Sequence, residues 1–248
     1  MTRSPTRKSV LVPMVAIGCL ASLLWLERRR PLRRPALAPA ARVRENIGIG
    51  IGAALVAAAV EGPLTNRLAS AVERTRIGLV PQLRLSPFGE RVAALLLFDY
   101  TLYLWHVLLH RMPVLWKWHR VHHADKDLDV STAVRFHAAE MASSLPWRAA
   151  QVLLIGVGPA TLDLWRRLTL VEVIFHHANL RLPNALEAVL GCVVMTPRSH
   201  SIHHSDVQAH QRSNLSSGLA VWDLLHGTAM RNVPQASITI GLPAERSD

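Results

Sequence analysis

The sequence predicts an all-α integral membrane protein with about four to five transmembrane or hairpin helices. Half of its 248 residues are hydrophobic, and they gather in apolar runs separated by basic segments, as is usual in membrane proteins. All thirteen histidines lie at or after residue 106, and most recur at the spacing of one helical turn. The helices are therefore expected to carry a histidine-rich metal site, on the cytoplasmic face.

Charge and cysteine content exclude several classes of protein. The net charge is +11, but no nucleic-acid-binding motif is present and the arginines crowd beside apolar runs, so anionic lipid headgroups are the expected counter-charge. Cys19 and Cys192 are too few for a disulfide framework or a Cys-rich zinc site. An iron–sulfur or rubredoxin-like centre needs four thiolates. Electrons for any redox chemistry must therefore come from a partner.

Residues 1–45 are predicted to be an anchor helix and a basic loop. Val10–Leu26 is an uncharged run of 17 residues, at the short end of what spans a bilayer. Three basic residues precede it, which is also typical of a signal peptide: Arg3, Arg7 and Lys8. Glu27 and an arginine cluster follow directly without a convincing cleavage site, so the helix is expected to be retained. The greater positive charge after the run places residues 27–45 in the cytoplasm.

Residues 46–91 are predicted to be a second membrane helix and a connecting loop. Asn46–Val60 is apolar, and Gly48 and Gly52 have the small-xxx-small spacing of a helix–helix contact. A glycine-rich nucleotide loop is the alternative, but no strand-turn-helix context supports it. Residues 61–91 contain three prolines and are expected to form a loop or interfacial segment.

The following segments alternate between apolar and polar character. Val92–Leu109 is a third apolar run, whereas the residues up to 137 are polar and rich in histidine. Two more apolar stretches, 139–158 and 161–177, are joined by glycines and a proline and predict a helical hairpin. Leu186–Thr196 is too short to span a bilayer and is placed at the interface. The tail, residues 231–248, has little periodicity and is expected to be loosely ordered.

The expected topology brings the histidines to one side of the membrane. If residues 27–45 are cytoplasmic, the second run leaves the cytoplasm and the third returns, so that the segment from His110 to His137 is cytoplasmic. The hairpin then leaves and returns, which places His177 on the same side. The later histidines follow on that face.

The histidine spacing predicts a metal centre. Three clusters hold eight histidines: His106 and His110; His119, His122 and His123; His200, His203 and His204. Positions i and i+4 share one helix face, so two rings can reach one metal while the adjacent ring turns to a second. A lone histidine is usually a surface or hydrogen-bonded core residue, but that explanation fails for three spaced clusters. Imidazole binds Fe, Zn, Cu and Ni, so these ligands alone leave the metal open.

Asp99 is the candidate catalytic carboxylate. Asp99, Tyr103, His106 and His110 fall at i, i+4, i+7 and i+11 and form one helical stripe. Asp99 can then accept a hydrogen bond from the far N–H of a ligand, or line the site as a polar contact. The alternative is a charge satisfied by a neighbouring helix.

Beyond these patterns, the chain resembles the fatty acid hydroxylase/sterol desaturase superfamily over about residues 92–228. The resemblance rests on HVLLH, HRVHH and RFHAAE within 99–140, FHHANL at 175–180, TPRSHSIHH at 196–204 and WDLLHGT at 222–228. It implies a catalytic domain at 92–230 in a membrane-bound, non-haem di-iron enzyme. Such enzymes use O2 and an external electron donor to hydroxylate or desaturate lipids.

The resemblance also assigns residues. The eight clustered histidines match the metal ligands of the family's three histidine motifs, called histidine boxes. His137 matches the histidine of the family's Arg-x-His-Pro-x-Glu segment, and His177 matches that of its His-x-Asn segment. Three features depart from the family pattern: Ala138 replaces a proline, Asn214-Leu215-Ser216 replaces Asn-Tyr-Gly, and His226 replaces a phenylalanine. None of these three differences changes a histidine-box ligand, so they affect the expected substrate rather than the expected metal site. His176 and His226 receive no role, and His210 is expected to face solvent.

The favoured function is oxidation of a lipid C–H bond by two iron ions with O2, at the bacterial inner membrane. The expected partners are a lipid within the membrane and a ferredoxin-, rubredoxin- or cytochrome-type electron donor, with no nucleic acid. A zinc-dependent hydrolase is the first alternative, although thirteen histidines exceed its needs. A metal transporter or haem-binding protein is the second. Sterol, carotenoid, fatty acyl and alkyl-ether substrates, and both hydroxylation and desaturation, fit the sequence.

Overall fold

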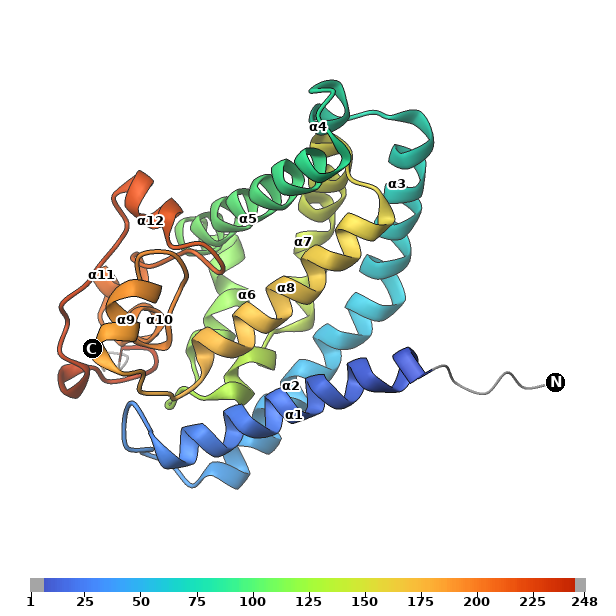
Figure 1. Ribbon diagram of the computed structural model, residues 1–248. Coiled ribbons are helices and arrows are strands. Elements are labelled where there is room, and N and C mark those ends of the chain that lie inside the picture. The colour runs from blue at the N-terminus through green and yellow to red at the C-terminus, as the bar shows by residue number, and fades with distance from the viewer. Residues whose placement is uncertain (1–6, 244–248) are drawn as a thin grey trace.

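The computed structural model describes residues 7–243, and these residues form a helical protein without a β-sheet (Figure 1). The all-α prediction is confirmed for this part of the chain. The α-helices are α1 (Arg7–Arg29), α2 (Pro39–Val56), α3 (Gly62–Thr75), α4 (Leu79–Gln82), α5 (Pro87–Arg111), α6 (Pro113–His123), α7 (Ala138–Gln151), α8 (Pro159–His177), α9 (Asn184–Leu190), α10 (Pro197–His203), α11 (Gln208–Gln211) and α12 (Val221–His226). Two π-helical segments, η1 (Ala57–Glu61) and η3 (Val152–Gly156), and two 3-10 segments, η2 (Val130–Val134) and η4 (Gln235–Ser237), complete them.

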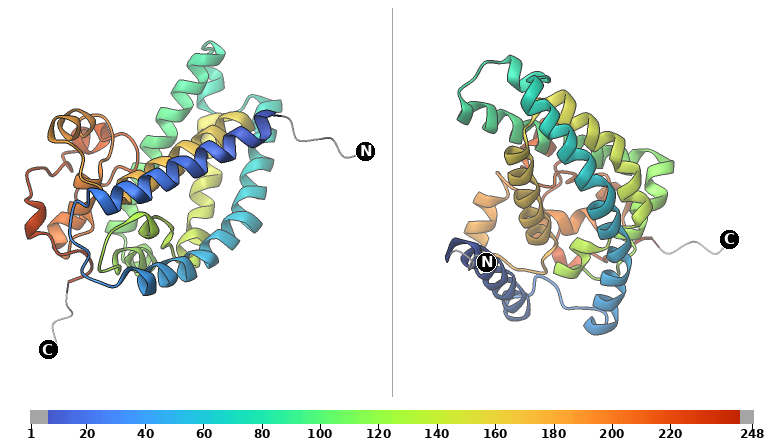
Figure 2. Two further views of the ribbon diagram at one scale, coloured as in Figure 1. Left: turned by 60° about the horizontal axis from the view of Figure 1, so that its bottom comes forward. Right: turned by 90° about the vertical axis from the view of Figure 1, so that its right-hand side faces the viewer.

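The second predicted run belongs to one continuous curved helix. α2, η1 and α3 follow one another without a break, and Figure 2 shows this helix bending along one edge of the molecule. For residues 61–91, the alternative of a loop was therefore wrong at α3, whereas that of an interfacial segment stays a prediction. Pro63 lies in the first turn of α3, directly after the π-helical turn. A π turn changes the hydrogen-bond register, so the N–H that proline lacks is not required there.

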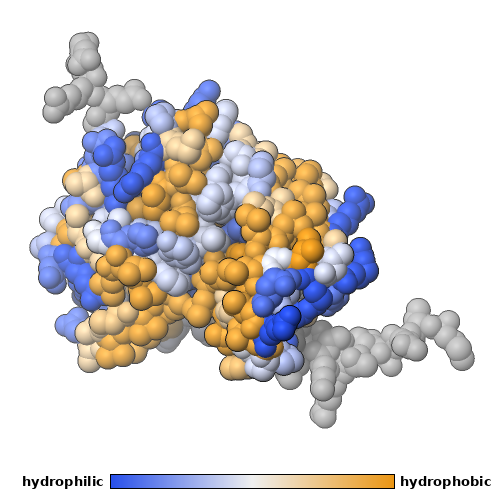
Figure 3. Space-filling view, turned by 90° about the horizontal axis from the view of Figure 1, so that it is seen from above, coloured by the Kyte–Doolittle hydropathy of each residue, from blue (hydrophilic) through white to orange (hydrophobic). Residues whose placement is uncertain are grey.

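Among the residues that the structure describes in full, two helices are long and apolar enough to cross a membrane by length and composition: the helix within Ala40–Gln82 and α5. α5 contains the third predicted run and begins where Ser86 accepts a hydrogen bond from the Gly89 N–H, 3.2 Å away, with Pro87 in its first turn. Ser86 thus satisfies an N–H that the first turn leaves free, and proline fits that turn. Seen from above, apolar side chains cover much of the surface, and hydrophilic residues gather mainly at its margins (Figure 3).

The predicted hairpin exists, but its two helices diverge. α7 continues through η3 to a turn at Gly156, whose φ of +84° favours glycine, and α8 starts at Pro159. The turn packs against α3, and Val72, Phe98, Leu162 and Trp165 lie in the apolar core there. Beyond this end α7 and α8 separate (Figures 1 and 2), which leaves room for the cavity described below.

Glycines of α2 allow the following segments to approach closely. A Cβ at Gly50 would lie 2.3 Å from the carbonyl oxygen of Val134, and one at Gly52 would lie 3.3 Å from the Cβ of Ala138. Gly48, in contrast, faces no atom within 4 Å. The predicted small-residue contact therefore exists on α2, but Gly50 takes the place that the spacing assigned to Gly48.

A polar network fastens α2 to the chain after α6. The Asp125 carboxylate accepts hydrogen bonds from Arg42, Asn46 and Thr132, each at 2.8 Å. All four residues are buried. Because Asp125 is two residues beyond His123, this network positions the end of the second histidine cluster.

The C-terminal part of the described chain packs against the histidine clusters. Gln235 accepts hydrogen bonds from Arg33 and Ser201, each at 2.7 Å. Ile240 is 8% exposed and forms an isolated bridge with Ser205. The expectation of a loosely ordered tail was therefore wrong up to residue 243, and the last five residues lie outside the described part.

Candidate metal centre

Four helix ends meet at the histidines. α5 ends at Arg111, Met112 is extended, and Pro113 starts α6, so the chain turns sharply and brings the end of α6 back over the end of α5. α8 ends at His177, and the short helix α10 closes the site from the other side. Thr196 caps α10 by accepting from the Ser199 N–H at 3.3 Å, and Pro197 occupies its first turn.

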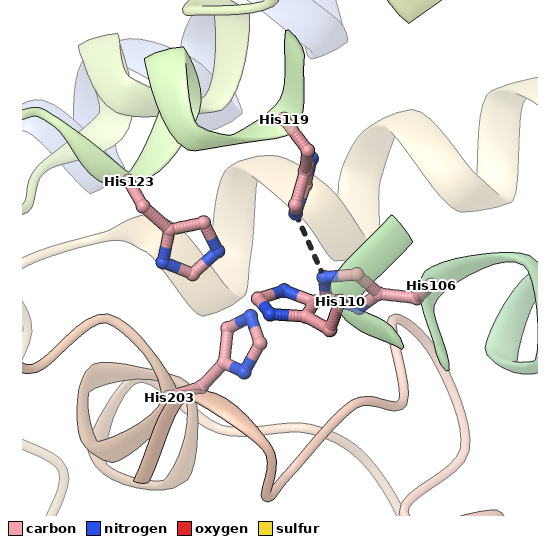
Figure 4. Close-up of side chains that lie close together, drawn as sticks. All are labelled: His106, His110, His119, His123 and His203. Carbon is pink, nitrogen blue, oxygen red and sulfur yellow. Dashed lines mark hydrogen bonds between the residues drawn. The ribbon is translucent and has the colours of Figure 1, made fainter. Parts of the chain in front are cut away.

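Nine buried histidines form two groups, within each of which the candidate ligand nitrogens lie within 4.8 Å of one another. The first group is His106, His110, His119, His123 and His203, whose rings point toward a common centre in Figure 4. The second group is His122, His177, His200 and His204. Adjacent histidines of a box thus turn to different groups, as the spacing predicts for two metal ions.

Hydrogen bonds to carbonyl oxygens fix the tautomer of several rings. The Nδ1–H of His106 donates to Leu215 O at 2.7 Å, that of His177 to Val173 O at 2.7 Å, and that of His203 to Ser213 O at 2.9 Å. His122 makes a longer bond, 3.3 Å, to Arg135 O. Because a carbonyl oxygen only accepts, each Nδ1 carries the proton and each Nε2 presents a lone pair to the interior.

These lone pairs face one another across short distances. His122 Nε2 lies 3.0 Å from His177 Nε2, and both rings have already used their proton at Nδ1. Two such lone pairs repel each other unless a cation lies beside them. The donor set therefore fits a metal ion, since neutral imidazole is a good ligand and its other nitrogen is usually held by a hydrogen bond.

Burial keeps the histidines neutral. It lowers the pKa of His122, His123, His200, His203 and His204 well below the usual 6.5, and neighbouring histidines lower it further. Neither ring nitrogen of His123 has a hydrogen-bond partner, nor have Nε2 of His110 and His203. Buried nitrogens are rarely left without a partner. A metal ion in each group would satisfy these lone pairs.

One loop orients three rings. Ser213, Leu215 and Ser217 direct alternate carbonyl oxygens to His203, His106 and His176. Asp223 holds this loop by accepting from the N–H of Leu215 at 2.7 Å and of Ser216 at 2.9 Å. The aspartate belongs to the WDLLHGT motif, but no feature of that motif predicted its contact with the loop.

Glu140 is a further residue of the site that sequence reasoning did not assign. Its Oε1 accepts from His119 Nδ1 at 2.9 Å, whereas its buried Oε2 has no partner. A carboxylate behind a ligand imidazole orients the ring and raises its basicity. Glu140 lies in the RFHAAE motif, so this motif was the sequence feature that could have identified Glu140 as a site residue.

Two predicted residues lie outside both histidine groups. His137 caps α7, where its Nδ1 accepts from the Ala139 N–H at 3.1 Å, and its ring stacks on Trp118 with centroids 5.0 Å apart. Asp99 accepts from the Leu219 N–H at 3.0 Å and from Trp222 Nε1 at 2.6 Å. Asp99 therefore links the 213–219 loop to α5, and within residues 7–243 it makes no hydrogen bond to a histidine.

The remaining histidines are distinct from the groups. The His176 ring lies beside the second group, with its centroid 4.0 Å from that of His200, while its Nδ1 donates to Ser217 O at 3.0 Å. His210 is half-buried rather than solvent-facing, with its Nδ1 2.8 Å from the Ser205 hydroxyl. His226 stacks on Tyr103 at 5.1 Å.

An apolar cavity of about 660 Å³ ends at the histidines. It lies between the diverging helices α7 and α8, and its walls include Ala57, Leu102, Met141, Trp165 and Val173. His106, His119, His122, His176, His177 and His200 line its inner part. The volume is in the range of small-molecule binding sites. The arrangement thus combines a hydrocarbon-compatible space with a candidate two-metal centre.

Comparisons with known proteins agree with this site. The family model described as fatty acid hydroxylase matches residues 91–228, which contain all nine grouped histidines. No solved structure matches the chain.

Three curated relatives share the same region. Ornithine lipid hydroxylase OlsE of Rhizobium tropici is 31% identical over 149 residues, 60% of this chain and 44% of the relative. The cholesterol 25-hydroxylase-like protein of Danio rerio is 32% identical over 143 residues, 56% of this chain and 55% of that protein. Human alkylglycerol monooxygenase is 26% identical over 137 residues, which are 55% of this chain and 29% of that protein. The chain spans about half the length of the first two relatives and less of the third.

Proposed function

The chain belongs to the fatty acid hydroxylase family, and we propose that it is a membrane-bound, O2-dependent di-iron oxidoreductase that oxidises a C–H bond of a lipid. The observation that carries the proposal is the meeting of two groups of buried histidines with the inner end of an apolar cavity. A lipid chain in this cavity would place a carbon beside both groups.

The residues present favour two iron ions. The first group offers five imidazoles and the second four, whereas a catalytic zinc ion needs three protein ligands. When bound, the two ions would supply the activation of O2 that oxidation of an unactivated C–H bond requires. The protein's own contribution is to hold neutral imidazoles in a fixed orientation, through the carbonyls of residues 213–217 and through Glu140. The apolar walls of the cavity exclude water and align the hydrocarbon chain of the lipid.

The cavity and the helices around it favour a lipid as the substrate. The helix within Ala40–Gln82 has the length and composition of a membrane span, and it contributes Ala54, Ala57 and Ala58 to the cavity wall. A lipid can thus reach the cavity from the bilayer. We place the histidines at the cytoplasmic face of the bacterial inner membrane, because most positive charge of residues 1–45 follows the apolar run Val10–Leu26.

The relatives favour hydroxylation. Their names describe two hydroxylases, or hydroxylase-like proteins, and a monooxygenase, acting on an ornithine lipid, a sterol and an alkylglycerol. These molecules share a hydrocarbon part but differ in their polar part. We therefore propose insertion of oxygen into the hydrocarbon part of a membrane lipid.

The test is to purify the protein in mild detergent, quantify its metals, and follow O2 uptake and lipid products. His122→Ala and His203→Ala each remove one ligand from a different group, and His210→Ala is the matched control outside both groups. We expect about two iron ions per chain, a loss of iron and of activity in both variants, and no loss in the control. Iron and activity retained in both variants contradict the di-iron site, and zinc without O2 uptake supports a hydrolase instead.

A further inference from the structure

The oxidation proposed above needs two electrons that the lipid does not supply. Among residues 7–243 the candidate metal groups are the two histidine groups, and Cys19 and Cys192 are both exposed and far apart in sequence. The described residues therefore offer no cysteine-ligated redox centre. A redox protein that docks on this one would supply the two electrons across a surface near the histidines.

A second cavity reaches the first histidine group without sharing any residue with the apolar cavity. Its volume is about 190 Å³, and it is lined by His110, Arg111, Pro113, Trp116, Gln208, Gln211 and Arg212. Its lining is more polar than that of the large cavity and includes Arg111 and Arg212. The centre thus has two approaches, of which the smaller does not suit a hydrocarbon chain.

Trp116 joins this second cavity to the metal centre. Its ring is half-buried and forms part of the cavity wall. The ring centroid lies 5.0 Å from that of His110, 5.4 Å from that of His123 and 6.1 Å from that of His119. Trp116 therefore lies between the surface and the candidate ligands His119 and His123, whereas His110 lines the second cavity itself. Electron tunnelling depends steeply on distance, so this is a favourable point of entry.

The surface around Trp116 is basic with a small apolar part. Arg111, Lys117 and Arg212 are exposed, and neither 108–120 nor 207–214 contains an aspartate or glutamate. Met112 and Val114 are 42% and 64% exposed. Weak redox complexes have small interfaces, and complementary charge increases the rate at which such partners meet.

We infer that an acidic one-electron carrier protein docks at this surface, defined by Arg111, Pro113, Trp116, Lys117 and Arg212, and reduces the centre through Trp116. The inference rests on the proposed function. Two encounters supply two electrons, so that a lipid R–H, O2, two electrons and two protons give R–OH and water. The C–H bond supplies the other two of the four electrons that O2 takes up.

The first experiment reverses the charge of the surface. Arg111→Glu/Arg212→Glu is compared with Arg74→Glu/Arg91→Glu, which changes net charge equally at exposed positions on α3 and α5. The donors are three acidic carriers, a [2Fe–2S] ferredoxin, a rubredoxin and a flavodoxin, and dithionite with a small mediator replaces them in a parallel assay. We expect the first variant to lower kcat/KM for the effective carrier at least ~10-fold at low salt, with a smaller effect at high salt. Dithionite-driven turnover, iron content and the control variant should be unchanged.

The second experiment tests the path. Trp116→Leu is compared with Trp116→Phe, and the reoxidation of reduced carrier is followed by stopped flow in parallel with carrier binding and iron content. At saturating carrier, we expect the leucine variant to accept electrons at least several-fold more slowly, and the phenylalanine variant to retain most of the rate.

Distinct outcomes overturn the inference. If no acidic carrier supports turnover while dithionite does, or if the charge reversal leaves kcat/KM unchanged, the docking surface is wrong and the proposed function stands. If the charge reversal acts equally with dithionite and only in vesicles that contain phosphatidylglycerol, the arginines bind lipid headgroups instead. If the wild-type protein turns over with no reductant at all, the proposed function fails and the inference fails with it.

Discussion

At the scale of single residues, the chemistry of the site depends on which nitrogen of each imidazole carries its proton. Backbone carbonyls settle this for His106, His177 and His203. Glu140 does so for His119, because its Oε1 accepts a hydrogen bond from His119 Nδ1 at 2.9 Å. Among the residues that the structure describes, Glu140 is the one acidic residue that is hydrogen-bonded to a histidine of the two groups. A change at Glu140 therefore tests orientation without removing a ligand.

We predict that Glu140→Ala lowers the affinity of the first group for iron by roughly 10- to 100-fold, because His119 loses the partner that fixes its ring. Glu140→Gln keeps an acceptor oxygen in the same place and should restore much of the affinity. Competition between the protein and a chelator measures both. An alanine variant with wild-type affinity would show that the carboxylate does not orient His119.

The sequence predicted the residues whose role depends on their spacing, and missed those that act through backbone atoms. The positions of the eight clustered histidines followed from helix periodicity, and that of His177 from the expected topology together with the family resemblance. The structure brings all nine into two groups. The carbonyls of the 213–217 loop could not be predicted, since any residue type presents a carbonyl and only the folded path of the loop directs it. The metal-ligand role of these histidines stays a prediction, as does that of His137.

At the scale of helices, the site depends on the close approach of α2 to the segment that follows α6. This approach is possible because Gly50 has no side chain where the Val134 carbonyl lies. The sequence indicated a helix contact through glycines, but could not identify which glycine faces the neighbour, since the rotation of α2 is set by its contacts. It also missed α3, because a proline after a π-helical turn resembles a helix end when only the sequence is read.

Substitutions at two neighbouring glycines separate helix propensity from packing. We predict that Gly50→Ala destabilises the protein by about 1–3 kcal/mol, since its Cβ would displace a backbone carbonyl. Gly48→Ala should be neutral or stabilise by up to ~1 kcal/mol, because alanine favours a helix and its Cβ meets open space. Thermal unfolding in detergent compares the two. Equal effects would mean that α2 does not pack on Val134 as described.

At the scale of the whole molecule, the divergence of α7 and α8 determines what can reach the histidines. The helices meet at the Gly156 turn and separate toward the metal centre, and α2, η1 and α5 complete the walls of the space between them. Lipid and electrons would thus arrive on different sides of one centre, since the two cavities share no lining residue. A substitution that narrows the apolar cavity should therefore leave electron transfer to the centre unchanged.

This separation yields a prediction for a cavity-wall residue that belongs to neither histidine group. Ala57 lines the apolar cavity, whereas Ala59, in the same π-helical segment, is exposed and does not. We predict that Ala57→Phe lowers kcat/KM for lipid oxidation roughly tenfold or more, because the ring occupies volume that the hydrocarbon chain needs. Iron content and the rate at which a carrier reduces the centre should stay at the wild-type level, and Ala59→Phe should change none of the three. Lipid product analysis, iron quantification and stopped-flow reduction measure them. If Ala57→Phe leaves lipid oxidation unchanged, the substrate does not occupy the space between α7 and α8; if it lowers reduction as well, the two routes are not independent.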